Sequence, residues 1–138
     1  MRKRTFTALS SVLMFALPAV VHAAPARDDA VPSIVLWDTP ADASSGRITE
    51  RSDDPALPDR FIEYVRAPYL AVYAPPRPNG TALLVTPGGG YARIGLDKEG
   101  TSLVPAFVDA AGITLFVLRY RLPDRMHADG ADAPLADA

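Results

Sequence analysis

Hydrophobic residues in the second half of the chain follow spacings that predict strands and one helix. Alternation over Tyr69–Tyr73 predicts a strand, and the continuous apolar runs at 81–85 and 113–118 predict strands buried on both faces. Between these runs, apolar residues recur at helical spacing from 103 to 111, and Gly112 predicts the helix end. Strand, loop, helix and strand make a βαβ unit, so a parallel sheet is expected.

The first half of the chain divides into two segments of different character. Basic residues at 2–4 precede an apolar run at 6–21 and small residues before Pro25, which predicts a signal peptide over 1–23. A membrane anchor is disfavoured because Pro18 and two serines interrupt the run. The protein is therefore expected to be secreted or periplasmic.

Two further segments complete the expected organisation. Residues 24–58 are rich in Pro, Asp, Ala and Ser, and predict an irregular leader with one short strand at most. Residues 59–138 hold the regular pattern and are expected to form the folded domain.

Charge and composition limit the partners. The chain has a formal net charge of −2 and becomes more negative once the basic signal segment is removed. Such a chain, with no basic cluster, is a poor candidate for binding nucleic acid or an anionic membrane. It contains no cysteine, so disulfides and thiolate metal sites are excluded, and neither a metal nor a cofactor is expected.

One glycine-rich loop, Pro87–Tyr91, carries the candidate chemistry between a predicted strand and the predicted helix. A phosphate-binding P-loop is excluded because Leu96 and Asp97 stand where Lys and Ser or Thr are required. A dinucleotide fingerprint is disfavoured because Arg93 replaces its third glycine. An oxyanion hole and a simple glycine-rich turn remain.

Four segments in register favour the oxyanion hole. They are Val85–Tyr91, Asp97–Gly100, Phe116–Leu122 and Ala133–Ala138. In this order and spacing they resemble bacterial secreted α/β-hydrolase esterases, the group that includes acetyl esterases, acetylxylan esterases and feruloyl-type esterases. The resemblance covers residues 60–138.

The resemblance implies a fold and a site. The fold would be the N-terminal part of an α/β-hydrolase domain, truncated, with a mostly parallel sheet and at least one βαβ unit. Backbone amides of Gly89 and Gly90 would stabilise the oxyanion, and Tyr91 would line the acyl pocket, although packing against the following helix explains it equally well. Pro87 stands where lipases usually have His. Residues 97–99 are expected to form a solvated loop and helix start.

The catalytic triad of such an esterase is missing from this chain. No serine lies in a G-x-S-x-G pattern; His22 falls in the signal segment and His127 in a polar loop. The nucleophile would be expected about 30 residues beyond Ala138, which favours an N-terminal fragment. Such a fragment would leave the strand at 113–118 as an unpaired edge, and is expected to be poorly soluble and without esterase activity.

The expected function is carboxylic-ester hydrolysis by serine acyl transfer, with the triad absent from this chain. The substrates implied are acetylated or feruloylated polysaccharides, or small acyl esters. Two alternatives stay open: a non-catalytic secreted fragment or binding protein, and a peptidase of the same fold. The sequence does not predict an oligomeric state.

Overall fold

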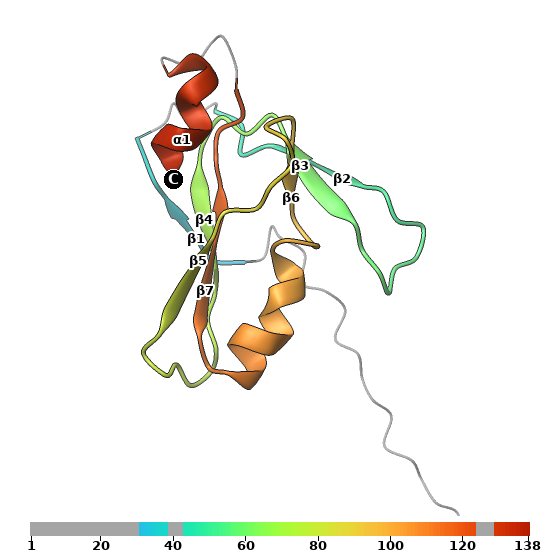
Figure 1. Cartoon of the computed structure of the whole chain (residues 1–138), viewed down its shortest axis with the longest axis vertical. Coiled ribbons are helices and arrows are strands. Elements are labelled where there is room, and N and C mark those ends of the chain that lie inside the picture. The colour runs from blue at the N-terminus through green and yellow to red at the C-terminus, as the bar shows by residue number, and fades with distance from the viewer. Residues whose placement is uncertain (1–30, 39–42, 124–128) are drawn as a thin grey trace, which may run out of the picture.

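The computed structural model describes residues 31–38, 43–123 and 129–138, so the predicted signal peptide lies outside the described residues. Two small sheets, three short helical turns and a final α-helix make up this part (Figure 1). In chain order the elements are β1 (Ser33–Val35), β2 (Arg47–Glu50), β3 (Arg60–Glu63), β4 (Tyr69–Tyr73), β5 (Ala82–Val85), β6 (Ile94–Gly95), η2 (Thr101–Leu103), η3 (Val104–Ala110), β7 (Thr114–Arg119), η4 (Gly130–Asp132) and α1 (Ala133–Asp137). None of the helices described is long and apolar enough to cross a membrane.

The prediction of a truncated α/β-hydrolase fold with a mostly parallel sheet is wrong. The four-stranded sheet has the order β1-β4-β7-β5, in which β4 pairs antiparallel with both β1 and β7. The three-stranded sheet, β2-β3-β6, is antiparallel throughout. Among the described strands, the expected parallel pairing occurs between β5 and β7 alone.

The connections explain why the parallel prediction fails. Apolar runs report burial but not strand direction, which is fixed by the segments that join the strands. A short turn joins β4 to β5 and reverses the chain, whereas η2 and η3 return it so that β7 runs parallel to β5. Because β7 is inserted between β4 and β5, its second pairing must be antiparallel.

Burial corrects two further expectations about the strands. β5 is an edge strand on which exposed and half-buried residues alternate, and Leu84 is 53% exposed, so it is not buried on both faces. The run 113–118 is not an unpaired edge, because β7 is paired on both sides. The edge strands of this sheet are therefore β1 and β5.

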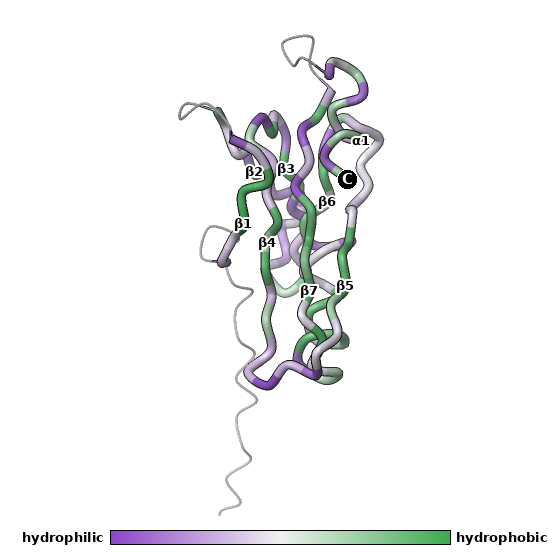
Figure 2. The backbone as a smooth tube through the Cα atoms, turned by 90° about the vertical axis from the view of Figure 1, so that its left-hand side faces the viewer, coloured by the Kyte–Doolittle hydropathy of each residue, from purple (hydrophilic) through white to green (hydrophobic). Residues whose placement is uncertain are grey.

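Two apolar clusters stabilise the sheets. One packs Val108 of η3 against Ala71, Leu115 and Val117 on one face of the four-stranded sheet. The other joins the end of β7 to the second sheet; it contains Ile62, Val65, Ile94, Leu96, Leu118, Tyr120 and Leu122. Figure 2 shows the apolar residues concentrated along β1, β4, β5 and β7.

The predicted helix is present in an irregular form. A 3₁₀ turn, η2, leads into the π-helix η3, which carries Pro105 in its first turn. Gly112 ends it with a φ of +70°, and the amide of Ile113 donates to the Phe107 carbonyl, which confirms the predicted end.

The leader is more regular than expected. Its described part supplies two strands, β1 against β4 and β2 against β3, instead of one at most. β2 and β3 form a hairpin that projects from the body of the molecule (Figure 1).

Candidate functional site

The glycine loop takes backbone angles that explain its composition. Gly89 has a φ of +153°, and a Cβ there would lie 1.9 Å from the carbonyl oxygen of Arg93, so no other residue fits without moving the backbone. Gly90 and Tyr91 follow with φ values of +64° and +59°. These three consecutive residues with positive φ turn the chain sharply between β5 and β6.

Three hydrogen bonds hold the start of the loop. The Tyr120 hydroxyl donates to the carbonyl oxygen of Pro87 at 2.9 Å, and the Gly88 amide donates to Oε2 of Glu99 at 2.6 Å. The Gly95 amide donates to the Gly88 carbonyl oxygen at 2.9 Å. Burial raises the pKa of the Tyr120 hydroxyl, and electrostatic repulsion from the nearby Glu99 and Tyr91 side chains opposes its ionisation further, so this hydroxyl stays a donor.

The residues predicted to form the oxyanion hole leave their amides available. Among the described residues, no hydrogen bond is made by the amide N–H of Gly89, Gly90 or Tyr91. Gly90 and Tyr91 are also exposed, so a ligand oxygen has access to this part of the loop. Backbone donors fixed in place in this way suit an oxygen that carries or develops negative charge.

A pocket of about 460 Å³ lies beside the loop. Tyr64 and Tyr91 both line it, both have a φ of +59°, and both are about two-thirds exposed. Residues other than glycine in this conformation are strained, and such strain is concentrated at functional sites. The full lining is Ser44, Tyr64, Val65, Arg66, Tyr91, Ala92, Leu122 and Pro123.

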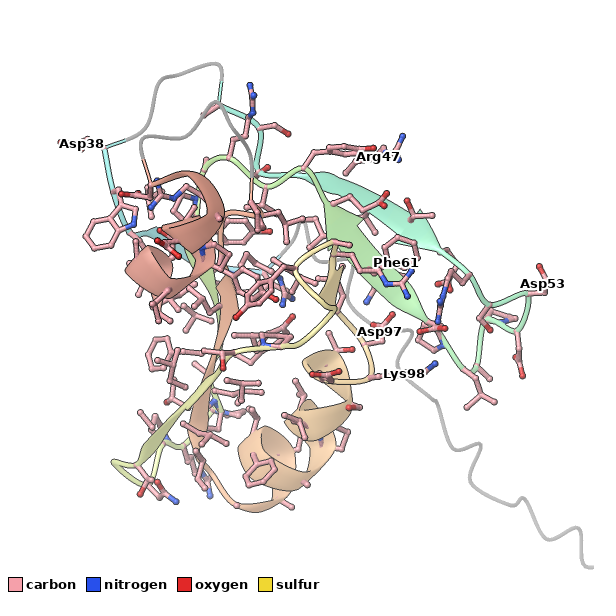
Figure 3. The ribbon with its side chains drawn as sticks, turned by 45° about the horizontal axis from the view of Figure 1, so that its top comes forward. Asp38, Arg47, Asp53, Phe61, Asp97 and Lys98 are labelled. Atoms are coloured by element: carbon pink, nitrogen blue, oxygen red, sulfur yellow. The ribbon has the colours of Figure 1, made fainter. Side chains whose placement is uncertain are left out.

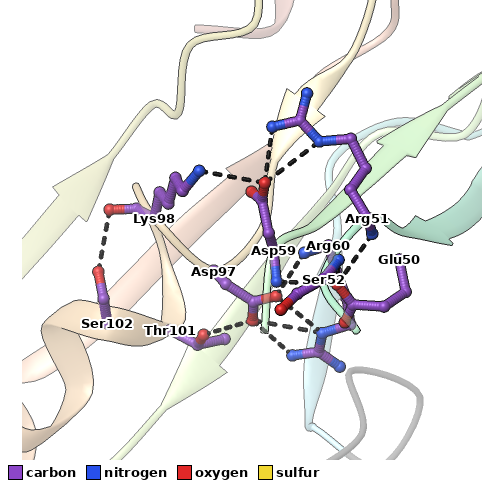
Figure 4. A network of polar contacts seen from close by, with 9 residues as sticks. All are labelled: Glu50, Arg51, Ser52, Asp59, Arg60, Asp97, Lys98, Thr101 and Ser102. Atoms are coloured by element: carbon purple, nitrogen blue, oxygen red, sulfur yellow. Dashed lines mark hydrogen bonds and ion pairs between the residues drawn. The ribbon is translucent and has the colours of Figure 1, made fainter. Parts of the chain in front are cut away.

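A buried ion pair lies behind the loop, where the sequence predicts a solvated segment. Asp97 is 4% exposed and accepts hydrogen bonds from the Arg60 amide, from Nε and Nη2 of Arg60, and from the Thr101 hydroxyl (Figure 4). The expectation of a solvated loop is therefore wrong for Asp97. It holds for Lys98, which is exposed and pairs with Asp59 at 3.1 Å.

The surroundings of Asp97 stabilise its charged form. Burial alone would raise the pKa of this carboxyl, but the hydrogen bonds from the side chain and backbone of Arg60 and from Thr101, together with the Arg60 charge, lower it overall. Figure 3 shows Asp97 and Lys98 beside Phe61 of β3, far from Asp53 at the hairpin tip. The pair thus joins the segment after the glycine loop to the second sheet.

A second ion-pair cluster joins the C-terminal helix to the end of β7. Asp137 accepts hydrogen bonds from the amide, Nε and Nη2 of Arg121, and from Nε1 of Trp37 at 2.8 Å. Arg121 also pairs with Asp129 at 2.9 Å. The sequence does not reveal this cluster, because its members are far apart along the chain.

The described residues contain no nucleophile–base pair. Ser44 lines the pocket, but its Oγ accepts the Gly46 amide at 3.0 Å, and Ser102 donates to the Lys98 carbonyl. His22 and His127 lie outside the described residues. In the same part of the chain, no group of three potential metal ligands is found.

Comparisons with known proteins do not assign the chain to a family. No protein-family model matches it, and searches of curated sequences and of solved structures find no significant match. The resemblance to secreted esterases therefore stays a prediction.

Proposed function

We propose that the glycine loop and its pocket bind the ester group of a carboxylic ester, as the oxyanion-stabilising part of a secreted serine ester hydrolase. The observation that carries the proposal is the row of unbonded amides at Gly89, Gly90 and Tyr91 beside a pocket that Tyr91 helps to line. Attack on an ester carbonyl turns its oxygen into an oxyanion, and fixed donors lower the barrier to that step.

The division of labour follows from the residues present. The loop amides would hold the oxygen, and the pocket would receive the organic group on the acyl side. Proton transfer needs a His or an equivalent base within reach of the attacking hydroxyl. The described residues hold no His, so such a base would come from outside them.

The lack of a base among the described residues favours a second candidate function as well. An oxyanion loop without a nucleophile can serve a protein that binds an anionic or ester ligand and does not turn it over. One measurement separates the two candidates, which is whether the protein hydrolyses 4-nitrophenyl acetate. Hydrolysis that a serine-directed fluorophosphonate abolishes supports the esterase, and saturable binding without turnover supports the binding protein.

Both candidates require the loop to bind an anion, and a direct binding experiment tests this requirement. The probe is 4-nitrophenyl methylphosphonate, a stable anion with the shape and charge of the tetrahedral intermediate. Titration followed by ¹H–¹⁵N NMR should move the amide resonances of Gly89, Gly90 and Tyr91 in a saturable way. 4-Nitrophenol, which lacks the phosphonate oxygens, should leave them in place.

Two tyrosine variants test the pocket. Tyr91→Gly and Tyr64→Gly each remove an exposed ring at a position with a φ of +59°, which glycine adopts without strain. We expect Tyr91→Gly to weaken phosphonate binding more, because Tyr91 belongs to the loop itself. Saturable binding that moves resonances elsewhere and leaves the loop unchanged would contradict the proposal.

A further inference from the structure

Both polar groups of a single peptide bond, the one joining Pro87 to Gly88, are held by side chains from other segments. Its carbonyl oxygen accepts from the Tyr120 hydroxyl at 2.9 Å, and its N–H donates to the Glu99 carboxylate at 2.6 Å. A peptide unit is planar, so two partners on its opposite polar ends fix its orientation. This peptide directly precedes the amides of the candidate oxyanion hole.

We propose that Glu99 and Tyr120 are positioning residues that set the orientation of the Pro87–Gly88 peptide, so that the amides of Gly89 and Gly90 face the ligand. The proposal rests on the proposed function of the loop. Neither side chain would touch the ligand; both act through the backbone.

The loop needs such restraints because of its composition. Glycine resists rotation of the backbone less than any other residue, so a run of three glycines does not hold one peptide orientation by itself. Gly88 also allows the carboxylate to come close, because a Cβ at this position would lie 3.1 Å from Oε2 of Glu99. The Gly95 amide, in β6, donates to the next carbonyl, that of Gly88.

The two partners come from segments that are themselves anchored. Tyr120 follows β7 and is buried in the cluster that joins the two sheets. Glu99 lies two residues after Asp97, whose ion pair with Arg60 fixes that stretch of chain. The orientation of the peptide is thus set by the core, although Glu99 is itself exposed.

The test compares Glu99→Ala, Glu99→Gln and Tyr120→Phe with the control Asp109→Asn, which changes an exposed carboxylate on η3. Glutamine keeps a carbonyl oxygen that accepts the Gly88 amide, whereas alanine does not. We expect Glu99→Ala and Tyr120→Phe to weaken binding of 4-nitrophenyl methylphosphonate about tenfold, as loss of a hydrogen bond to a fixed partner implies. Glu99→Gln should recover most of that loss.

A second readout needs no ligand. In the free protein, Glu99→Ala should shift the Gly88 and Gly89 amide resonances and speed exchange of the Gly88 amide proton, while Asp109→Asn leaves both unchanged. Unchanged loop resonances together with wild-type affinity in Glu99→Ala would overturn the positioning role, as would equal losses in Glu99→Ala and the control. If the unmodified protein fails to bind the phosphonate, the proposed function fails, and the ligand-free resonances still decide the positioning role.

Discussion

Replacement of Asp97 by asparagine tests the ion pair behind the glycine loop. The substitution keeps the shape of the side chain but removes its charge. It also replaces one acceptor oxygen with an NH₂ group, whose two hydrogens then face groups that themselves donate. Those groups are the Arg60 amide, the Arg60 guanidinium and the Thr101 hydroxyl. The side chains of Arg60 and Asp97 are 13% and 5% exposed, so water cannot replace the lost acceptor well.

The expected loss follows from this burial. Removing one partner of a buried pair costs about 3–5 kcal/mol because the other charge stays buried. The free energy of unfolding of an ordinary domain is about 5–15 kcal/mol, so Asp97→Asn should remove a large share of the stability of this protein. Asp53→Asn, at an exposed position in the hairpin turn, should change stability by less than about 0.5 kcal/mol.

Urea unfolding followed by circular dichroism measures both variants. We expect Asp97→Asn to lower the midpoint strongly with an unchanged slope, and Asp53→Asn to match the unmodified protein. A free energy of unfolding for Asp97→Asn within about 0.5 kcal/mol of the unmodified protein would refute this expectation, since that range is typical of surface changes.

The same carboxyl gives a dependence on pH. Its pKa is lower in the folded protein than in the unfolded chain, so its contribution is present above the unfolded value of about 3.9 and is lost as the pH falls through the folded value. The unmodified protein should therefore lose stability below about pH 4. The Asp97→Asn variant should lose less stability over the same pH range. An equal loss in the variant would show that the Asp97 carboxyl is not the cause of the pH dependence.

Three further predictions concern the loop, the sheet edge and the C-terminal helix. Gly89→Ala should destabilise the protein more than Gly90→Ala. A Cβ at Gly90 meets open space, so its only cost is the strain of a positive φ, about 1–2 kcal/mol. Equal losses of unfolding free energy in urea would contradict this prediction. Leu84→Lys should increase the monomer fraction by light scattering, since β5 is an uncharged edge strand; an unchanged fraction would contradict it. Asp137→Asn should shift the fluorescence of Trp37, the sole tryptophan, to longer wavelength as its hydrogen bond weakens, and an unchanged spectrum would count against that contact.

Local signals in the sequence are reliable where the structure depends on near neighbours. The apolar runs at 81–85 and 113–118 are strands, and Gly112 ends the helical segment as its position predicts. The glycine loop lies directly after a strand, where the sequence analysis places it. These features depend on residues within one turn or one strand of each other.

Features set by distant residues could not be predicted in the same way. Strand direction depends on where β7 is inserted, which the apolar pattern does not contain. The burial of Asp97 depends on Arg60, 37 positions away, and a cluster of charges usually marks a solvated surface. The contact of Glu99 with the Gly88 amide spans only 11 positions, and an acidic residue close after a glycine loop is a usable signal for such a contact.

The buried pair and the candidate site belong to one stretch of chain. Residues 87–100 leave β5 at the glycine loop, pair with β3 through β6, and return to the start of the loop through Glu99. Asp97 fixes the far end of this stretch on Arg60, two residues before Glu99. A change at Asp97 should therefore reach the Gly88 amide without any contact with the loop, because it displaces the carboxylate that holds this amide. The position of Glu99 therefore couples the stability of the second sheet to the geometry of the oxyanion loop.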